Sequence, residues 1–143
     1  MTYMGPTPCI KLPLRLLVCG DRNWADDLLI YNTLAPHKNN ISVIIQGEAR
    51  GADTKARLAA EALSIFVLSY PARWAKQGRA AGPLRNRRML YDGQPNFVLA
   101  FHDDIESSKG TRDMLLLAGQ VDVPRCLVSH EDPGAFAAML KGS

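Results

Sequence analysis

Two glycine-containing segments carry residue types suited to holding an anion. In QGEARGAD, Gly47 and Gly51 flank Arg50, and Asp53 follows them. Glycines at a turn let backbone N–H groups approach a phosphate without a Cβ in the way, and the positive end of a following helix adds attraction. Asp53 is expected to cap that helix. Taken alone, a plain glycine turn joining a strand to a helix is the alternative.

The second segment, SKGT, repeats this arrangement further along the chain. Lys109, Gly110 and Thr111 combine a small-residue turn, a hydroxyl group and a new helix N-terminus, and Ser107 and Ser108 add donors. Such a combination predicts an anion cradle. A solvated serine-rich surface turn is the competing interpretation.

Arginines are concentrated between these two segments. Arg85 and Asn86 fall in the first turn of an expected helix, where a guanidinium grips phosphate or carboxylate through two hydrogen bonds and Asn86 contacts ribose or base. Arg87 and Arg88 are expected to face solvent. A solvated polar helix face is the alternative for the run of four polar residues over 85–88. Arg73 and Arg79 precede this run and complete the concentration of arginines.

Four further residues are candidates because of their positions. Gly20 ends the first expected strand, so Asp21 and Arg22 follow at a point that contacts phosphate or sugar in doubly wound folds. Trp74 lies in an irregular segment, where it either stacks on a base or covers an edge of the core. We therefore add Gly20, Asp21, Arg22 and Trp74 to the predicted ligand-binding residues.

Metal and cofactor chemistry are not expected. His102, Asp103 and Asp104 are adjacent and cannot all converge on one ion, and His37 and His130 have no partnered ligands nearby in the sequence. The three cysteines form no CxxC or Cys/His spacing, and their odd number argues against a secreted disulfide scaffold. A reducing compartment, the cytoplasm, is therefore expected.

Size and charge indicate an ordinary globular chain. The 143 residues suit one domain, with 47% apolar and 22% charged residues. The formal charge of +3 suffices to attract small anions but makes nucleic acid an unlikely partner. Residues 1–13 contain three prolines and have no signal or membrane-anchor pattern, so we expect a flexible leader followed by a domain over 14–143, with no membrane contact.

Apolar segments alternate with helical ones along the chain. Strands are expected at 14–19, 41–45, 65–69, 96–101 and 125–129, and helices at 26–34, 54–63, 111–118 and 133–140, with one more beginning at Pro83 after an irregular stretch over 71–82. This order predicts an α/β fold, a single Rossmann-like three-layer domain with a parallel sheet of about five strands. Because ligands bind at the carboxyl ends of such strands, Gly47–Gly51, Arg85 and Lys109–Thr111 are expected to surround one cavity.

Five ordered motifs resemble a known family. RLLVCGDRNW, QGEARGAD, PARW, GRAAGPLRNRRML and SKGTRDM are similar to the YspA-type, cpYpsA-related branch of the SLOG superfamily, over residues 14–128. The resemblance implies a Rossmann-like domain for nucleotide ligands. The related lonely-guy phosphoribohydrolases release a base from nucleoside 5′-monophosphates and build their pockets across a dimer, which implies a possible homo-oligomer.

The resemblance to those enzymes is partial. Arg85 corresponds to their arginine-helix position and Gly110-Thr111 to the GT pair of their PGGxGTxxE loop, but this chain lacks the double glycine and has Met114 at the glutamate position. Cleavage of an N-glycosidic bond passes through an oxocarbenium-like state, which a carboxylate near the sugar stabilises. Asp113 is one residue away from the glutamate position, and on a helix a shift of one residue turns the side chain by about 100 degrees around the helix axis.

Two functions from different classes follow. The sequence predicts binding of a nucleotide or nucleotide-derived small molecule without a cofactor. The alternative is a nucleoside 5′-monophosphate N-glycosidase that uses Asp113, or Asp21 or Glu48 from a neighbouring loop, as its carboxylate. A third hypothesis, DNA binding, rests on the DprA group of the same superfamily, which acts on single-stranded DNA; the low aromatic content and modest charge give it little support.

Overall fold

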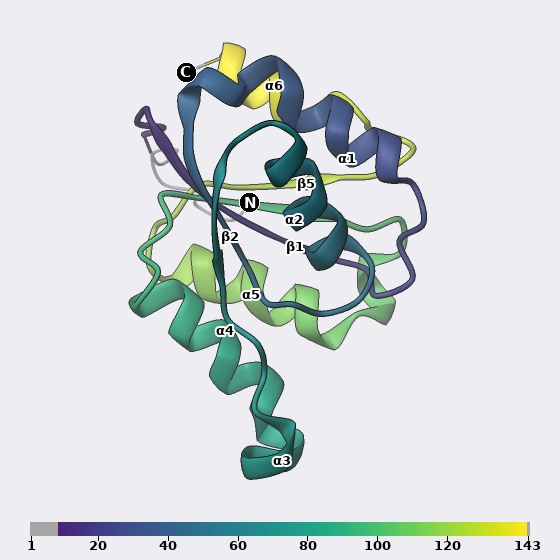
Figure 1. The fold of residues 1–143 in the computed structure, drawn as a ribbon, viewed down its shortest axis with the longest axis vertical. Coiled ribbons are helices and arrows are strands. Elements are labelled where there is room, and N and C mark those ends of the chain that lie inside the picture. Colours follow the sequence, from purple (N-terminus) through teal and green to yellow (C-terminus); the bar gives the residue numbers. More distant parts are fainter. Residues whose placement is uncertain (1–8, 143) are drawn as a thin grey trace, which may run out of the picture.

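Five parallel strands form the sheet of the computed structural model, which describes residues 9–142 (Figure 1). The strand order is β3-β2-β1-β4-β5. The chain therefore builds outward on one side of β1 and then crosses to the other side, which makes the junction of β1 and β4 the switch point where such sheets bind ligands. The strands are β1 (Leu14–Gly20), β2 (Ile41–Gln46), β3 (Phe66–Ser69), β4 (Phe97–Phe101) and β5 (Arg125–Val128).

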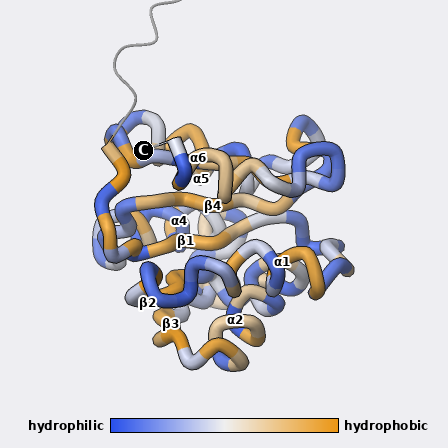
Figure 2. Tube along the Cα trace, turned by 90° about the horizontal axis from the view of Figure 1, so that it is seen from above, coloured by the Kyte–Doolittle hydropathy of each residue, from blue (hydrophilic) through white to orange (hydrophobic). Residues whose placement is uncertain are grey.

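The two central strands are apolar because helices cover both of their faces. All five residues of β4 are buried, and Leu16, Leu17 and Val18 of β1 are fully buried. Figure 2 shows β1 and β4 as hydrophobic stretches through the middle of the molecule. Such continuous apolar runs are typical of parallel strands, whose alternate side chains enter two different cores.

Two helical layers pack on the sheet, α1 (Asp27–Leu34), α2 (Ala52–Ala62) and α6 (Ala135–Lys141) on one face and α4 (Ala81–Tyr91) and α5 (Lys109–Gln120) on the other (Figure 1). Leu16 joins the first core with Ile30 and Phe136, whereas its neighbour Leu17 joins the second core with Met114. The predicted three-layer Rossmann-like fold is therefore confirmed.

The observed helix bounds lie within two residues of the predicted ones. α1 begins one residue later than predicted, because Asp26 caps it with Oδ1 accepting from Leu29 N at 3.0 Å. After α1 the chain continues as a 3-10 helix over Ala35–Asn40. Pro83 lies inside the first turn of α4 because no intrahelical partner is needed there for the missing N–H.

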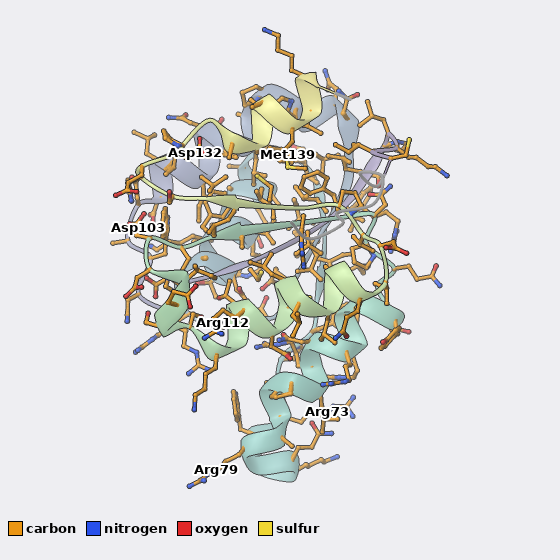
Figure 3. All side chains as sticks on the ribbon, turned by 180° about the vertical axis from the view of Figure 1, so that it is seen from behind. Arg73, Arg79, Asp103, Arg112, Asp132 and Met139 are labelled. Carbon is orange, nitrogen blue, oxygen red and sulfur yellow. The ribbon has the colours of Figure 1, made fainter. Side chains whose placement is uncertain are left out.

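The stretch expected to be irregular, 71–82, contains a short helix. α3 spans Trp74–Gln77, and a 3-10 turn over Gly78–Ala80 connects it to α4. Figure 1 shows α3 projecting from the body beyond α4, and Figure 3 shows Arg73 and Arg79 on this projection. Most of the clustered arginines are thus not gathered around one point.

The N-terminal segment is partly in contact with the domain. Of the predicted leader, residues 1–8 lie outside the described part of the chain. Ile10 packs against the first core, and Asn96 Nδ2 donates to Lys11 O at 3.2 Å and to Pro13 O at 3.1 Å. Within residues 9–142, none of the helices combines the length and the apolar character that a membrane crossing requires.

A glycine lets the loops after β1 and β2 touch. Gly51 has φ 79°, and a Cβ there would overlap the backbone of Asp21 and Arg22. Ala52 N donates to Asp21 O at 3.0 Å across the same contact. The start of α2 is therefore fastened to the end of β1.

We expect Gly51→Ala to lower the free energy of unfolding by more than about 2 kcal/mol, because the added Cβ combines a disfavoured φ with overlap against backbone. Gly134→Ala is the matched control, since a Cβ at Gly134 meets nothing within 4 Å. Urea unfolding followed by circular dichroism measures both. Equal stability of the two variants would contradict this account of the contact.

Candidate functional site

Buried polar side chains gather where β1, β2 and β4 end. Burying polar groups costs free energy unless each finds a partner, so such a cluster marks a place where polar chemistry is needed. Its members come from the strand ends and from the helices that follow: Gln46, Asp53, Arg85, Asn86, His102 and Thr111.

Arg85 is the centre of this cluster. Its side chain is 8% exposed; Nη1 donates to Gly47 O at 2.6 Å and Nε donates to Asn86 Oδ1 at 3.1 Å. A Cβ on Gly47 would overlap the guanidinium, so the glycine makes room for it. Within residues 9–142, Nη2 has no hydrogen-bond partner. The guanidinium is thus held in place with one terminal nitrogen still available.

Asp53 organises the turn after β2 instead of capping α2. Its Oδ2 accepts from Gly47 N at 3.1 Å and from Ala49 N at 3.3 Å. The predicted cap is wrong, because Asp53 lies inside the first turn of α2 and its side chain reaches back to the preceding loop. Gly51 occupies the N-cap position without a side-chain bond.

This arrangement also changes the role predicted for the glycine turn. Glu48 N donates to Gln46 Oε1 at 2.6 Å, so the amides of Gly47, Glu48 and Ala49 all have acceptors inside the protein. These three amides are not available to a phosphate, contrary to the prediction from the glycine spacing. The turn contributes instead the carbonyl that positions Arg85.

The start of α5 does present open donors. Ser108 caps the helix, its Oγ accepting from Thr111 N at 3.3 Å. The amides of Lys109 and Gly110 have no acceptor among the described residues, and a Cβ on Gly110 would meet nothing within 4 Å. Asn86 Nδ2 donates to Gly110 O at 3.3 Å, which holds this turn against α4. The helix dipole adds positive potential at these amides.

These groups surround two adjoining cavities. The first cavity, of about 420 Å³, is lined by the strand ends, α4 and the start of α5. The second cavity, of about 560 Å³, lies between the turn after β2 and Trp74. Both are bounded by Arg22, Ala49 and Arg85.

The structure distributes the predicted binding residues over both cavities. Gly20, Asp21, Arg22, Asp53, Arg85, Asn86 and Lys109–Thr111 line the first cavity. Gly47, Arg50 and Trp74 line the second, together with Arg22 and Arg85. Gly51 lines neither and instead contacts the loop after β1. The single cavity expected from the topology is therefore a pair of cavities that meet at Arg22 and Arg85.

The cations around the cavities have no carboxylate partners. Arg22, Arg50, Arg85 and Lys109 belong to none of the salt bridges found within residues 9–142. Arg50 Nη2 donates to the amide oxygen of Asn23 at 3.3 Å, and the Arg22 guanidinium lies 5.7 Å from the centre of the Trp74 ring. None of the four forms a salt bridge in the described part of the chain, although the carboxylate of Asp53 lies close enough to Arg85 to interact with its charge, so the cavities keep an excess of positive charge that an anion would complement.

Burial shifts the titration of the groups beneath the first cavity. It raises the pKa of Asp53 to about 6, although the nearby charge of Arg85 opposes the shift. Burial lowers the pKa of Arg85, which nevertheless stays protonated as arginines do in proteins. The Cys19 thiol has its pKa raised by burial and by Asp53, so it is not an activated nucleophile.

The three candidate catalytic carboxylates do not converge. Asp21 lines the first cavity, with Oδ1 accepting from Asn23 N at 2.9 Å. Glu48 lines the second and contacts Ser69 Oγ at 2.9 Å and Arg57 Nε at 3.3 Å. Asp113 lines a different cavity beside β5 and accepts from Asn86 Nδ2 at 3.0 Å.

Sequence reasoning missed His102 as a cavity residue. Its ring is 5% exposed and lines the first cavity, and Nδ1 accepts from Asp104 N at 2.9 Å. The neutral ring therefore carries its proton on Nε2. The signal was its position directly after β4, at the carboxyl end of a central strand. Within residues 9–142, no group of three or more His, Cys, Asp or Glu residues is arranged to hold a metal ion.

A second histidine joins the loops at this edge. Nδ1 of His130 lies 2.7 Å from Asp103 Oδ2, and Nε2 lies 2.8 Å from Asp26 Oδ2. The ring stacks on Trp24 with 4.8 Å between ring centres. Both carboxylates come from parts of the chain that are distant in sequence, so these contacts could not be inferred from the residues next to His130. These contacts raise the pKa of His130 and link the loops after β1, β4 and β5.

The fold and the site define a Rossmann-like α/β domain with a pair of arginine-lined cavities at its switch point. Residues 14–77, from β1 through α3, match the family described as the YspA, cpYpsA-related SLOG family. The match confirms the resemblance to this family and covers the first three of the five motifs, RLLVCGDRNW, QGEARGAD and PARW. No curated protein matches the chain in sequence.

The chain resembles a solved structure over most of its length. DNA processing protein A (DprA) from Streptococcus pneumoniae superposes with a TM-score of 0.63 at 16% sequence identity. The match covers 89% of this chain and 55% of that one, so this chain spans about half the length of that protein. At this identity, the likeness supports the fold beyond residue 77.

The raised pKa of Asp53 predicts pH-dependent anion binding. A bound anion disfavours the charged carboxylate further, so binding takes up a proton and strengthens as the pH falls through about 6. Sulfate is the suitable probe because its own charge does not change in this range. We expect its affinity, measured by calorimetric titration, to rise between pH 7.5 and pH 5.5.

Asp53→Asn supplies the control, since it keeps an oxygen acceptor for the two amides. This variant should bind sulfate with nearly the same affinity at both pH values. The same pH dependence in both proteins, or no sulfate binding in either, would contradict the assignment.

Proposed function

We propose that this chain binds a nucleotide or nucleotide-derived ligand, with a phosphate group in the first cavity. The observation that carries the proposal is the set of unpaired cations around that cavity, Arg22, Arg85 and Lys109, together with the open amides of α5. Phosphate is the common biological anion that matches both a guanidinium and a helix N-terminus.

Arg85 is suited to this role because the protein already holds it in position. Hydrogen bonds to Gly47 O and Asn86 fix the guanidinium before any ligand arrives. A preorganised group loses little side-chain entropy on binding. Ser108 and Thr111 line the same cavity, and their hydroxyl groups are the further donors for phosphate oxygens, whereas the hydroxyl of Ser107 already donates to Asp104 O at 2.8 Å.

Other groups in the first cavity suit the sugar. Asp21 follows β1, where a carboxylate accepts hydrogen bonds from ribose hydroxyls in doubly wound folds. His102 contributes an Nε2–H donor in its neutral form. The cavity thus offers donors for phosphate and both an acceptor and a donor for hydroxyl groups.

Binding is favoured over N-glycosidase chemistry by the positions of the carboxylates. Asp113 and Glu48 line other cavities, which leaves Asp21 as the candidate to stabilise an oxocarbenium-like state. The hydrolase therefore stays the alternative, and it would depend on Asp21.

We also propose that the protein works in the cytoplasm. The cysteines of the described chain are all free, which suits that reducing compartment.

A pair of charge-reversal variants on α5 tests the proposal. Lys109→Glu replaces a cation lining the first cavity, whereas Arg112→Glu changes the same charge on the same helix outside that cavity. We expect Lys109→Glu to weaken binding of nucleoside 5′-monophosphates by tenfold or more, as loss of a charge-assisted hydrogen bond implies. Arg112→Glu should stay within about threefold of wild type. Calorimetry gives both values.

The same samples separate the other hypotheses. Failure of all four common nucleoside monophosphates to bind, or equal weakening by the two variants, would reject the phosphate assignment. Release of free base, detected by chromatography and abolished by Asp21→Asn, would show that the protein hydrolyses the nucleotide instead of only binding it. Salt-sensitive binding of a single-stranded oligonucleotide, without binding of mononucleotides, would instead favour a nucleic-acid partner.

A further inference from the structure

The second cavity has its own binding chemistry, which a phosphate in the first cavity leaves unused. We infer that the ligand is an extended nucleotide, one whose phosphate continues through a second phosphate to another group, and that it occupies both cavities. This inference rests on the proposed function and adds the class of ligand.

The junction of the two cavities carries the argument for a second phosphate. Arg22 and Arg85 line both cavities, and neither forms a salt bridge within residues 9–142. Arg85 is more than nine-tenths buried, and its Nη2 has no partner there. With Lys109 on one side and Arg50 on the other, the positive charge extends along a path, as a diphosphate requires.

Trp74 gives the second cavity a surface for a planar or sugar-like group. Trp74 is 51% exposed although it lines a cavity, and Arg22 lies over its ring. Glu48 also lines this cavity, but its carboxylate is already bound to Gln46, Ser69 and Arg57. The aromatic ring and the arginines are therefore the groups left to contact a ligand.

The dimensions agree with an extended ligand. Each cavity, at about 420 Å³ and 560 Å³, lies within the range typical of a site for one small molecule. A nucleoside monophosphate brings one phosphate and one base, whereas the two cavities together offer two cation-lined regions and an aromatic ring. A nucleotide joined through a diphosphate to a second group reaches both.

Matched pairs of ligands test this inference. AMP is compared with ADP-ribose, UMP with UDP-glucose and GMP with GDP-mannose, so that each pair shares a base and differs by the extension. We expect at least one extended ligand to bind about tenfold more tightly than its monophosphate. Calorimetry on the full chain measures each affinity.

Two aromatic variants localise the effect. Trp74→Ala should remove most of the gain for the extended ligand and leave the monophosphate within about threefold of wild type, since stacking on an aromatic ring is lost only for the extension. Tyr91→Ala is the matched control, an exposed aromatic residue on α4 that lines neither cavity. It should bind both ligands as wild type does.

The outcomes distinguish the two proposals. Equal affinity within every pair, or equal weakening of both members by Trp74→Ala, overturns the extended ligand and leaves the phosphate site standing. Absence of binding by every monophosphate and every extended ligand overturns both. Tighter binding of an extended ligand that Trp74→Ala does not affect also rejects the second cavity as its site.

Discussion

The buried guanidinium of Arg85 joins the parts of this molecule that attract a ligand. It donates to the carbonyl of Gly47 and to Asn86, and Asn86 in turn donates to the first turn of α5. One side chain on α4 is thereby connected to the turn after β2 and to the helix after β4. Its positive charge is offset by Asp53, which is itself tied to that turn. Without this network, the loops at the switch point would lack a common anchor.

The network explains why the protein tolerates several buried polar groups. Asp53 closes the glycine turn on itself, and the closed turn offers Arg85 a carbonyl instead of offering a phosphate its amides. In the proposed function, an anion is therefore bound by side chains and by the start of α5. The proposed site thus depends on a small number of hydrogen bonds that also stabilise the fold, which couples the site to local stability.

The fold could be read from the sequence because β1 and β4 are continuous apolar runs and each is followed by a helical pattern. Arg85, Lys109 and Thr111 were also identifiable, since strand ends and helix starts of such folds meet at one edge. The contacts that individual side chains make could not be predicted from the sequence. Asp53 turns backward, and His130 finds Asp26 and Asp103 from distant segments. The short helix α3, with four residues, carries too little periodicity to be recognised, so the second cavity escaped prediction.

The central claim is that Arg85 itself meets the anionic ligand. The direct measurement is nitrogen-detected magnetic resonance of the arginine side chains during titration with a nucleotide, with Arg85 assigned through Arg85→Lys. The account predicts that the Arg85 guanidinium signals shift to saturation while those of Arg87 and Arg88, which contact Pro83 and Pro71 carbonyls on the surface, stay in place. Saturable binding with no shift at Arg85 would contradict it.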